Sequence, residues 1–150
     1  MKGKAITILL VEDEDAHAVI VKRNLNDFKL ANKINHVKDG QAALDYLYQR
    51  NEYDDPLSSP RPELILLDLR LPKVDGLEVL KTIKTDPELM RIPVVVMTTS
   101  SAEKDITQAY DNYANSYLVK PLDLEQFMPM LESIGFYWLI WNQSPNINKI

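Results

Sequence analysis

Short runs of apolar residues in this chain end directly before acidic, hydroxyl or basic side chains. The clearest runs are 8–11, 64–67, 94–97 and 117–119, and a less apolar one lies at 34–37. The runs do not alternate with polar residues, so we expect strands whose two faces are both covered. The stretches between them are long enough for the helical crossovers that parallel strands need. The pattern predicts an α/β domain built on a parallel sheet.

Amphipathic stretches follow the predicted strands. After Asp13, apolar residues recur at three- and four-residue intervals, which is typical of a helix with one buried face. Asp39 and Asp75 each precede a glycine at the start of a further helix, and Ser100 with Glu103 fits a capping box before another. Strand and helix therefore alternate five times, which predicts a doubly wound sheet.

Composition narrows the class of protein. The 150 residues are 45% hydrophobic, which fits a single domain with a substantial core. The absence of cysteine excludes disulfides and thiolate metal sites. No segment has the form of a signal peptide or the ~20 apolar residues of a membrane span, so we expect a cytoplasmic protein without a membrane partner. A net charge of −5 argues against nucleic acid as a partner.

The polar residues that end the apolar runs form a candidate site. They are Glu12, Asp13, Asp68, Thr98 and Lys120. Strand carboxyl ends of a parallel sheet share one edge, so these side chains are expected to meet. Asp13 and Asp68 suit Mg²⁺, which prefers oxygen ligands, and Glu12 would act through a water. Clustered carboxylates also need a nearby cation, which Lys120 supplies.

The same residues suit phosphoryl transfer to a carboxylate. Asp68 stands alone after its strand and is the natural acceptor, because an aspartate can form an aspartyl phosphate. Thr98 can donate its hydroxyl to a phosphoryl oxygen, and Tyr117 can fill or leave the space that Thr98 vacates. Singly, Asp13 also fits a helix cap and Lys120 a surface charge. The joint placement of the acids, the Thr98 hydroxyl and Lys120 at successive strand ends favours the phosphoryl site.

Four motifs occur in order within residues 6–133. They are Leu9 to Asp13, Leu66 to Gly76, Pro93 to Thr99, and Tyr117 to Pro121. Together they resemble a single-domain response regulator receiver of two-component signalling. The resemblance implies a flavodoxin-like (βα)5 fold with strand order 2-1-3-4-5, and phosphorylation of Asp68 by a sensor histidine kinase. It also implies Mg²⁺ (or Mn²⁺) on Asp13, Asp68 and the backbone carbonyl of Arg70, and a cis Lys120–Pro121 peptide.

Two other functions remain open at this point. An Asp-nucleophile phosphohydrolase usually carries a second Asp two residues after its nucleophile, where this chain has Arg70. A phosphorylation-independent scaffold would not need the intact set of Asp68, Thr98 and Lys120. We therefore favour a non-enzymatic receiver that promotes only its own phosphorylation and dephosphorylation. Its output would pass through an unknown downstream protein or through oligomerisation, without a DNA-binding domain.

Arg70 and Ser100 lie two residues after Asp68 and Thr98, beside the predicted phosphoryl group. We predict that they set the lifetime of phosphorylated Asp68. The long loop at 50–62, the sequence around Thr98 and an aromatic C-terminal extension resemble response regulators that partner bacterial and cyanobacterial phytochromes. This resemblance implies a phytochrome as the sensor kinase.

The chain continues from the predicted receiver, 1–133, into an extension at 134–150. Its apolar residues form a second stripe that needs a partner, and exposed apolar surface often marks an interaction site. We predict a homodimer, with the alternative that the extension folds back on its own domain. Pro129 is expected to kink or divide the last helix. The interface candidates are Phe136, Tyr137, Trp138, Ile140 and Trp141.

Overall fold

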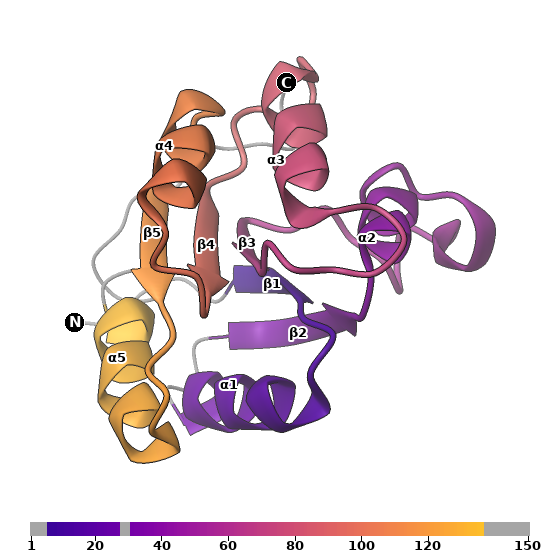
Figure 1. Cartoon of the computed structure of the whole chain (residues 1–150). Helices are drawn as coiled ribbons and strands as arrows, with labels where there is room; N and C mark the ends of the chain where they lie inside the picture. The colour runs from indigo at the N-terminus through magenta and orange to yellow at the C-terminus, as the bar shows by residue number, and fades with distance from the viewer. Residues whose placement is uncertain (1–5, 28–30, 137–150) are drawn as a thin grey trace.

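A parallel sheet forms the centre of the protein in this computed structural model, which describes residues 6–27 and 31–136 (Figure 1). Within those residues the sheet has five strands in the order β2-β1-β3-β4-β5, which confirms the predicted fold. The second strand is longer than predicted, because its pairing with the first strand extends back to Ala31. The strands are β1 (Ile6–Val11), β2 (Ala31–Val37), β3 (Leu64–Leu67), β4 (Val94–Thr98) and β5 (Ser116–Val119).

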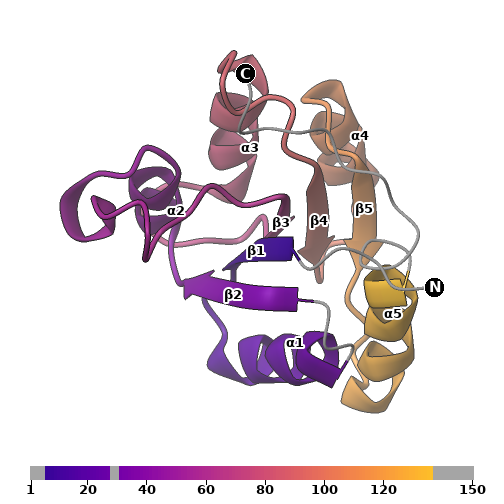
Figure 2. The same cartoon turned by 180° about the vertical axis from the view of Figure 1, so that it is seen from behind.

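Helices cover both faces of the sheet (Figures 1 and 2). One face is covered by α1 and α5, and the other by α2, α3 and α4. A short 3-10 helix, η1, follows α2 in the long loop before β3. The described helices are α1 (Asp15–Asp27), α2 (Gly40–Leu47), η1 (Asn51–Tyr53), α3 (Gly76–Thr85), α4 (Glu103–Asp111) and α5 (Leu124–Phe136).

The uninterrupted apolar runs supply two cores, one on each face. Leu9 and Val11 point into the core beneath α2, α3 and α4, whereas Ile8 and Leu10 point into the core beneath α1 and α5. Successive strand residues face opposite sides of a sheet, so a strand between two cores must be apolar at every position. Burial on both faces leaves the strand ends as the places where polar side chains gather.

Two glycines fix the loop that follows β3. The N–H of Gly76 donates to the carbonyl of Leu69 at 3.0 Å, and a Cβ on Gly76 would overlap the Asp68 carbonyl oxygen. A Cβ on Gly40 would likewise overlap the carbonyl of Val74. Gly40 and Gly76, the first residues of α2 and α3, therefore lie closer to the backbone of this loop than a residue with a Cβ could.

The last described helix passes through a proline. α5 continues from Leu124 to Phe136 with Pro129 inside it, so the proline does not divide the helix. The interface candidates Tyr137, Trp138, Ile140 and Trp141 lie outside the described residues, and Phe136 is the last residue of α5.

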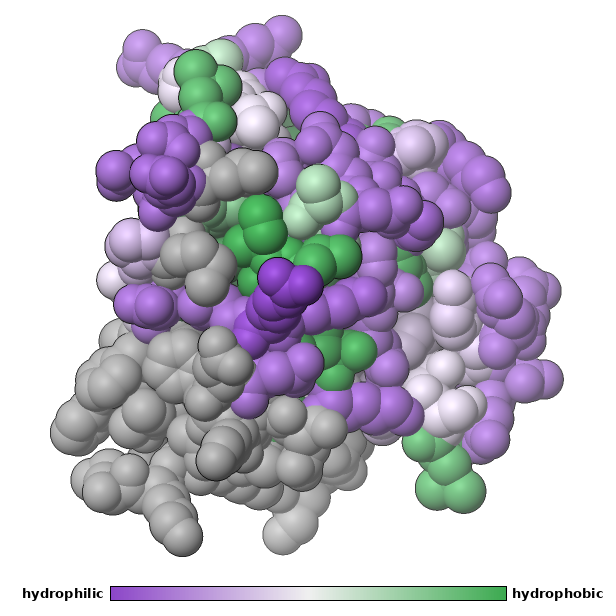
Figure 3. Space-filling view, turned by 90° about the horizontal axis from the view of Figure 1, so that it is seen from below, coloured by the Kyte–Doolittle hydropathy of each residue, from purple (hydrophilic) through white to green (hydrophobic). Residues whose placement is uncertain are grey.

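One face of the protein is mostly polar among its described residues. The face in Figure 3 is mainly hydrophilic, with hydrophobic residues gathered only in small patches among the coloured atoms. None of the helices in residues 6–27 and 31–136 is long and apolar enough to span a lipid bilayer.

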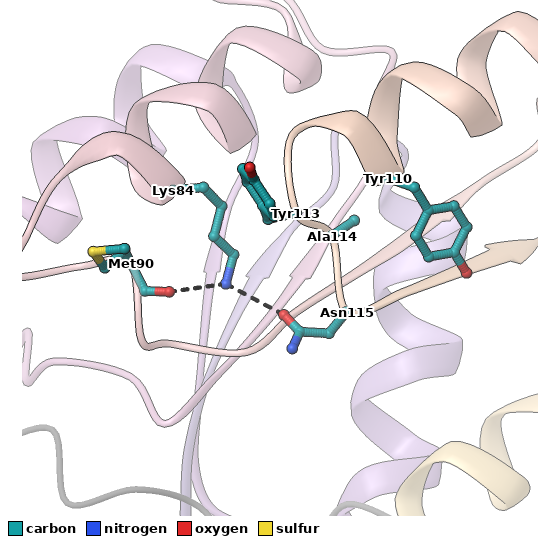
Figure 4. Close-up of a pocket in the computed structure, with 6 residues that line it drawn as sticks. All are labelled: Lys84, Met90, Tyr110, Tyr113, Ala114 and Asn115. Carbon is teal, nitrogen blue, oxygen red and sulfur yellow. Dashed lines mark hydrogen bonds between the residues drawn. The ribbon is translucent and has the colours of Figure 1, made fainter.

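An open pocket of about 600 Å³ lies at the amino-terminal ends of β4 and β5, at the opposite edge of the sheet from the predicted site (Figure 4). Lys84 lines it and donates from Nζ to the carbonyl oxygens of Met90 at 3.1 Å and Ile92 at 2.7 Å. The same ammonium donates to Asn115 Oδ1 at 3.3 Å. Burial lowers the pKa of Lys84 to about 8. These bonds give Lys84 a structural role, since one ammonium joins two loops.

Candidate functional site

Four of the predicted site residues converge at the carboxyl edge of the sheet. Glu12, Asp68 and Lys120 follow β1, β3 and β5, and Thr98 ends β4. The backbone continues the sheet hydrogen bonds past the strand ends, because the N–H of Asp68 donates to Val11 O at 3.1 Å and that of Lys120 to Thr98 O at 2.7 Å. The relative exposures of the four residues are 1%, 7%, 3% and 0% in the order named. A buried polar cluster of this kind needs internal partners.

Lys120 is the centre of the cluster. Its side chain is 1% exposed, and Nζ donates to Glu12 Oε1 and to Asp68 Oδ2, the latter at 3.0 Å. The third contact of the ammonium is His17 Nδ1 at 3.1 Å. A buried charge is tolerated when it is paired and its hydrogen bonds are satisfied, and Lys120 meets both conditions.

Asp68 is held as a carboxylate. Burial raises its pKa, but the charge of Lys120 and the backbone N–H of Arg70 outweigh burial and leave the pKa below its usual value. The Arg70 N–H donates to Asp68 Oδ1 at 3.1 Å, and Lys120 contacts the other oxygen. An ionised, fixed carboxylate is the form that can act as a nucleophile.

Glu12 differs from Asp68 in its electrostatic environment. Burial raises the pKa of Glu12 to about 7, although the hydrogen bond from Lys120 opposes the change. Its Oε2 accepts the backbone N–H of Glu14 at 3.2 Å, and its backbone carbonyl lies 2.7 Å from His36 Nε2. Glu12 is therefore fixed from several directions, and it competes with Asp68 for the charge of Lys120.

The acidic side chains form a group that fits a divalent cation. Ligand oxygens of Glu12, Asp13 and Asp68 all lie within 4.8 Å of one another. Three carboxylates against one ammonium leave two negative charges, which a divalent ion neutralises, and an all-oxygen donor set suits Mg²⁺ or Mn²⁺. Asp13 is exposed and precedes α1 by two residues, so it is not the residue that caps this helix. Ligation by the Arg70 carbonyl stays a prediction.

Thr98 ends β4, and Tyr117 of the neighbouring strand β5 contacts the loop that follows Thr98. Thr98 Oγ1 is fully buried without a hydrogen-bond partner among the described residues. Leaving a buried hydroxyl unpaired costs about 1–3 kcal/mol, which an incoming acceptor would recover. The Tyr117 hydroxyl donates to the carbonyl of Ser100 at 2.9 Å, and burial raises the pKa of Tyr117.

The side chains of Arg70 and Ser100 meet on α4. Arg70 Nη2 lies 2.6 Å from Asp105 Oδ2, and Ser100 Oγ donates to the same oxygen. The capping box predicted for Ser100 is wrong, because Ala102 is the residue that precedes α4 and makes no side-chain cap. The Ser100 hydroxyl donates to Asp105 instead. A contact between α4 and the β3–α3 loop thus takes the place of a helix cap.

The structure also corrects one backbone prediction. The Lys120–Pro121 peptide is trans, since the described residues contain no cis peptide bond. The trans form is the one that X–Pro bonds favour, by about 0.5–1 kcal/mol.

Sequence reasoning missed three residues of the site. His17 and His36 show no metal-ligand spacing in the sequence, yet each lies within hydrogen-bond distance of Lys120 or Glu12. Asp105, which contacts Arg70 and Ser100, belongs to no motif in the sequence. The sequence signal that could have identified His17 is its position in the first turn of α1, four residues after Asp13.

Comparisons with known proteins agree with this geometry. Residues 8–132 match the response regulator receiver domain. The probable methanogenesis regulatory protein FilR2 of Methanothrix harundinacea is 49% identical over 138 residues, which cover 92% of this chain and 86% of that protein. The response regulator Rcp1 of Synechocystis sp. is 46% identical over 132 residues, which cover 88% of each chain.

Two solved structures have closely similar folds. The Mn²⁺-bound form of Rcp1 superposes with a TM-score of 0.86 at 43% identity, covering 93% of this chain and 99% of that one. The phosphorylated cyanobacterial phytochrome response regulator RcpA superposes with a TM-score of 0.89 at 42% identity, covering 95% of this chain and 99% of that one. The likeness extends over nearly all of each chain.

Proposed function

Because the chain belongs to the response regulator receiver domain family, we propose that it accepts a phosphoryl group on Asp68 from a sensor histidine kinase. The observation that carries the proposal is the buried contact between the Lys120 ammonium and Asp68 Oδ2, beside a group of three carboxylates. The Asp68 oxygen would attack phosphorus and form an O–P bond. The P–N bond to the kinase histidine would break, with its electron pair leaving on nitrogen.

The residues around Asp68 would divide the work. Asp13, Asp68 and the Arg70 carbonyl would hold a divalent ion, with Glu12 acting through a water, and the bound ion would neutralise charge on the transferred oxygens. Lys120 already contacts Asp68 and would meet a second phosphoryl oxygen, and the free hydroxyl of Thr98 would donate to a third. We propose no separate enzymatic activity, since the product would remain attached to the protein itself.

Intact mass after incubation with Mg²⁺ and acetyl phosphate tests the acceptor. We expect the wild type to gain one phosphoryl group and Asp68→Asn to gain none. A wild type that stays unmodified, or an Asp68→Asn variant modified equally, would refute the assignment of Asp68.

The lifetime of phosphorylated Asp68 would depend on Arg70 and Ser100 through their shared partner. Both side chains contact Asp105, so Arg70 is directed toward α4 and away from the phosphoryl position. We propose that Asp105→Asn, which removes the charge holding Arg70, changes the dephosphorylation rate in the same direction as Ser100→Ala. Lys81→Ala, an exposed change on α3, serves as the control. Equal rates in all four proteins would contradict the proposal.

We propose a phytochrome as the sensor kinase, supported by the similarity to RcpA, which is a phytochrome response regulator. The similar relative FilR2 is named for methanogenesis regulation, so the partner needs a direct test. Phosphotransfer from a purified phytochrome kinase should be faster than from an unrelated histidine kinase, and its yield should depend on red light. Equal transfer from both kinases would refute a dedicated phytochrome partner.

We also propose that output involves a homodimer of this chain. The extension at 134–150, which follows the receiver at 1–133, would form the contact between the two copies. Light scattering after size exclusion tests this with the full chain and with a chain that ends at Ser133. A dimer that becomes a monomer on truncation is expected. A monomeric full chain would exclude the homodimer and leave another protein as the downstream partner.

A further inference from the structure

The ammonium of Lys120 has three N–H donors, and each has an acceptor in the structure. Two point to the carboxylates of Glu12 and Asp68, and the third faces His17 Nδ1 at 3.1 Å. Lys120 is 3% exposed, so water does not readily replace a missing acceptor. His17 therefore completes the hydrogen bonding of a buried charge.

The ring of His17 is fixed by its neighbours on two helices. His17 lies in the first turn of α1, and its ring meets Phe127 of α5 edge-on, with centroids 5.7 Å apart and planes at 83°. Phe127 is fully buried, so this contact orients the imidazole against the core. The packing of the ring therefore contributes to the position of Nδ1 beside Lys120.

The direction of the hydrogen bond follows from the charges around His17. Nδ1 lies 3.3 Å from Glu14 Oε2 as well as 3.1 Å from Lys120 Nζ. The Glu14 side chain is 59% exposed and can turn to water, whereas the Lys120 side chain is 1% exposed and cannot. An N–H on Nδ1 would place a proton against the ammonium, whose nitrogen is 3.1 Å away. Nδ1 is therefore the acceptor, and the ring carries its proton on Nε2.

We propose that His17 is a positioning residue for phosphoryl transfer, and that it acts by holding one N–H of Lys120. With one N–H on Nδ1 and another on Glu12, the remaining N–H is aimed at Asp68 Oδ2. This inference rests on the proposed function, because it assigns His17 a part in the same reaction. Without the Nδ1 acceptor the ammonium can rotate or shift toward Glu12, the closer carboxylate, and away from the attacking oxygen.

Two substitutions separate the acceptor from the ring. His17→Asn places an amide oxygen on the same Cγ that carries Nδ1, so it keeps an acceptor and loses the ring. His17→Phe keeps a ring that can pack edge-on against Phe127 and loses the acceptor. A purely structural role for the ring predicts that the Asn variant is the more damaged protein. The positioning role predicts the opposite order.

The first measurement is the rate of Asp68 phosphorylation by acetyl phosphate with saturating Mg²⁺. We expect His17→Phe to be slower than the wild type by about tenfold, the scale of one lost hydrogen bond to a charged group. His17→Asn should stay within about threefold of the wild type, which allows for imperfect amide geometry. A Phe variant as fast as the wild type, or an Asn variant as slow as the Phe variant, overturns the proposal.

The second measurement does not require phosphorylation. In EDTA, His17→Phe should unfold at a lower urea concentration than His17→Asn, because it leaves one Lys120 N–H buried without an acceptor. If His17→Asn instead unfolds at the lower urea concentration, Nδ1 does not hold Lys120 and the inference is overturned. The proposed function still stands in that case, provided that the wild type accepts a phosphoryl group. If the wild type accepts no phosphate, the proposed function fails and the role of His17 in transfer fails with it.

Discussion

Glu12 should make the stability of the metal-free protein fall as the pH rises. Burial raises the pKa of Glu12 from 4.5 to about 7 in the folded protein, whereas the unfolded chain ionises it near 4.5. Between these pH values the folded state binds more protons than the unfolded state. The free energy of unfolding then decreases with increasing pH. This is the reverse of the usual behaviour of a carboxylate in an ion pair.

The size of the effect follows from the pKa change. One pH unit of displacement corresponds to about 1.4 kcal/mol, so a rise from 4.5 to about 7 is worth roughly 3 kcal/mol. Asp68 has a lowered pKa, so its stabilising effect is complete above 3.8 and is lost only at lower pH. Burial lowers the pKa of His36 below 6.5, which makes stability rise with pH in the same range. The wild-type curve therefore needs a reference variant.

Glu12→Gln is that reference, because it keeps the shape and removes the titrating group. Urea unfolding in EDTA at pH 5 and pH 8 should show the wild type losing about 2–3 kcal/mol relative to Glu12→Gln. Mg²⁺ favours ionised Glu12 and should restore most of the loss at pH 8, through its preferential binding to the folded state. Parallel pH curves for the two metal-free proteins would refute the reasoning, because Glu12 would then ionise alike in both states.

Three further substitutions probe other parts of the structure. Gly76→Ala forces a Cβ against the Asp68 carbonyl. It should lower the free energy of unfolding in urea by about 1–3 kcal/mol and weaken Mg²⁺ binding. Unchanged values of both would contradict the close packing of the loop. Asp13→Asn should weaken Mg²⁺ binding at least about tenfold by calorimetry without lowering metal-free stability, because Asp13 is exposed; equal affinity would remove it from the metal site. Lys84→Met should lower the free energy of unfolding by about 1–3 kcal/mol, because Lys84 joins two loops. The phosphorylation rate should not change, since these loops lie at the sheet edge opposite Asp68. A slower rate would show that the two edges are coupled.

The part of the site that the sequence predicts is the part that strand order controls. Glu12, Asp68 and Thr98 stand at the carboxyl ends of strands that are buried on both faces, and Lys120 follows the partly buried edge strand β5. A doubly wound parallel sheet brings all strand carboxyl ends to one edge, whatever the details of the helices. Apolar runs and the residues that follow them are therefore enough to predict that these four groups lie together, and in the structure Lys120 contacts Glu12 and Asp68.

The contacts that the sequence does not predict depend on how helices are rotated and where loops begin. His17 reaches Lys120 only because α1 turns that face toward α5, and Asp105 reaches Arg70 only because α4 starts at Glu103. Each contact joins residues more than thirty positions apart, between a helix and a strand end or loop. Local propensity does not specify such pairs, so they require the packed structure.

Thr98 and Lys120 must respond differently to a phosphoryl group on Asp68, because they begin from opposite states. Lys120 has all three N–H donors occupied and can only exchange one acceptor for another. Thr98 Oγ1, in contrast, forms no hydrogen bond of normal geometry with the described residues, although it helps to lower the pKa of Asp68, and it can form a full bond to a phosphoryl oxygen. We therefore expect the larger structural response at the β4–α4 loop that follows Thr98. That loop carries Ser100, whose hydroxyl binds Asp105 and whose carbonyl accepts Tyr117, so movement of Thr98 strains the contacts that hold α4.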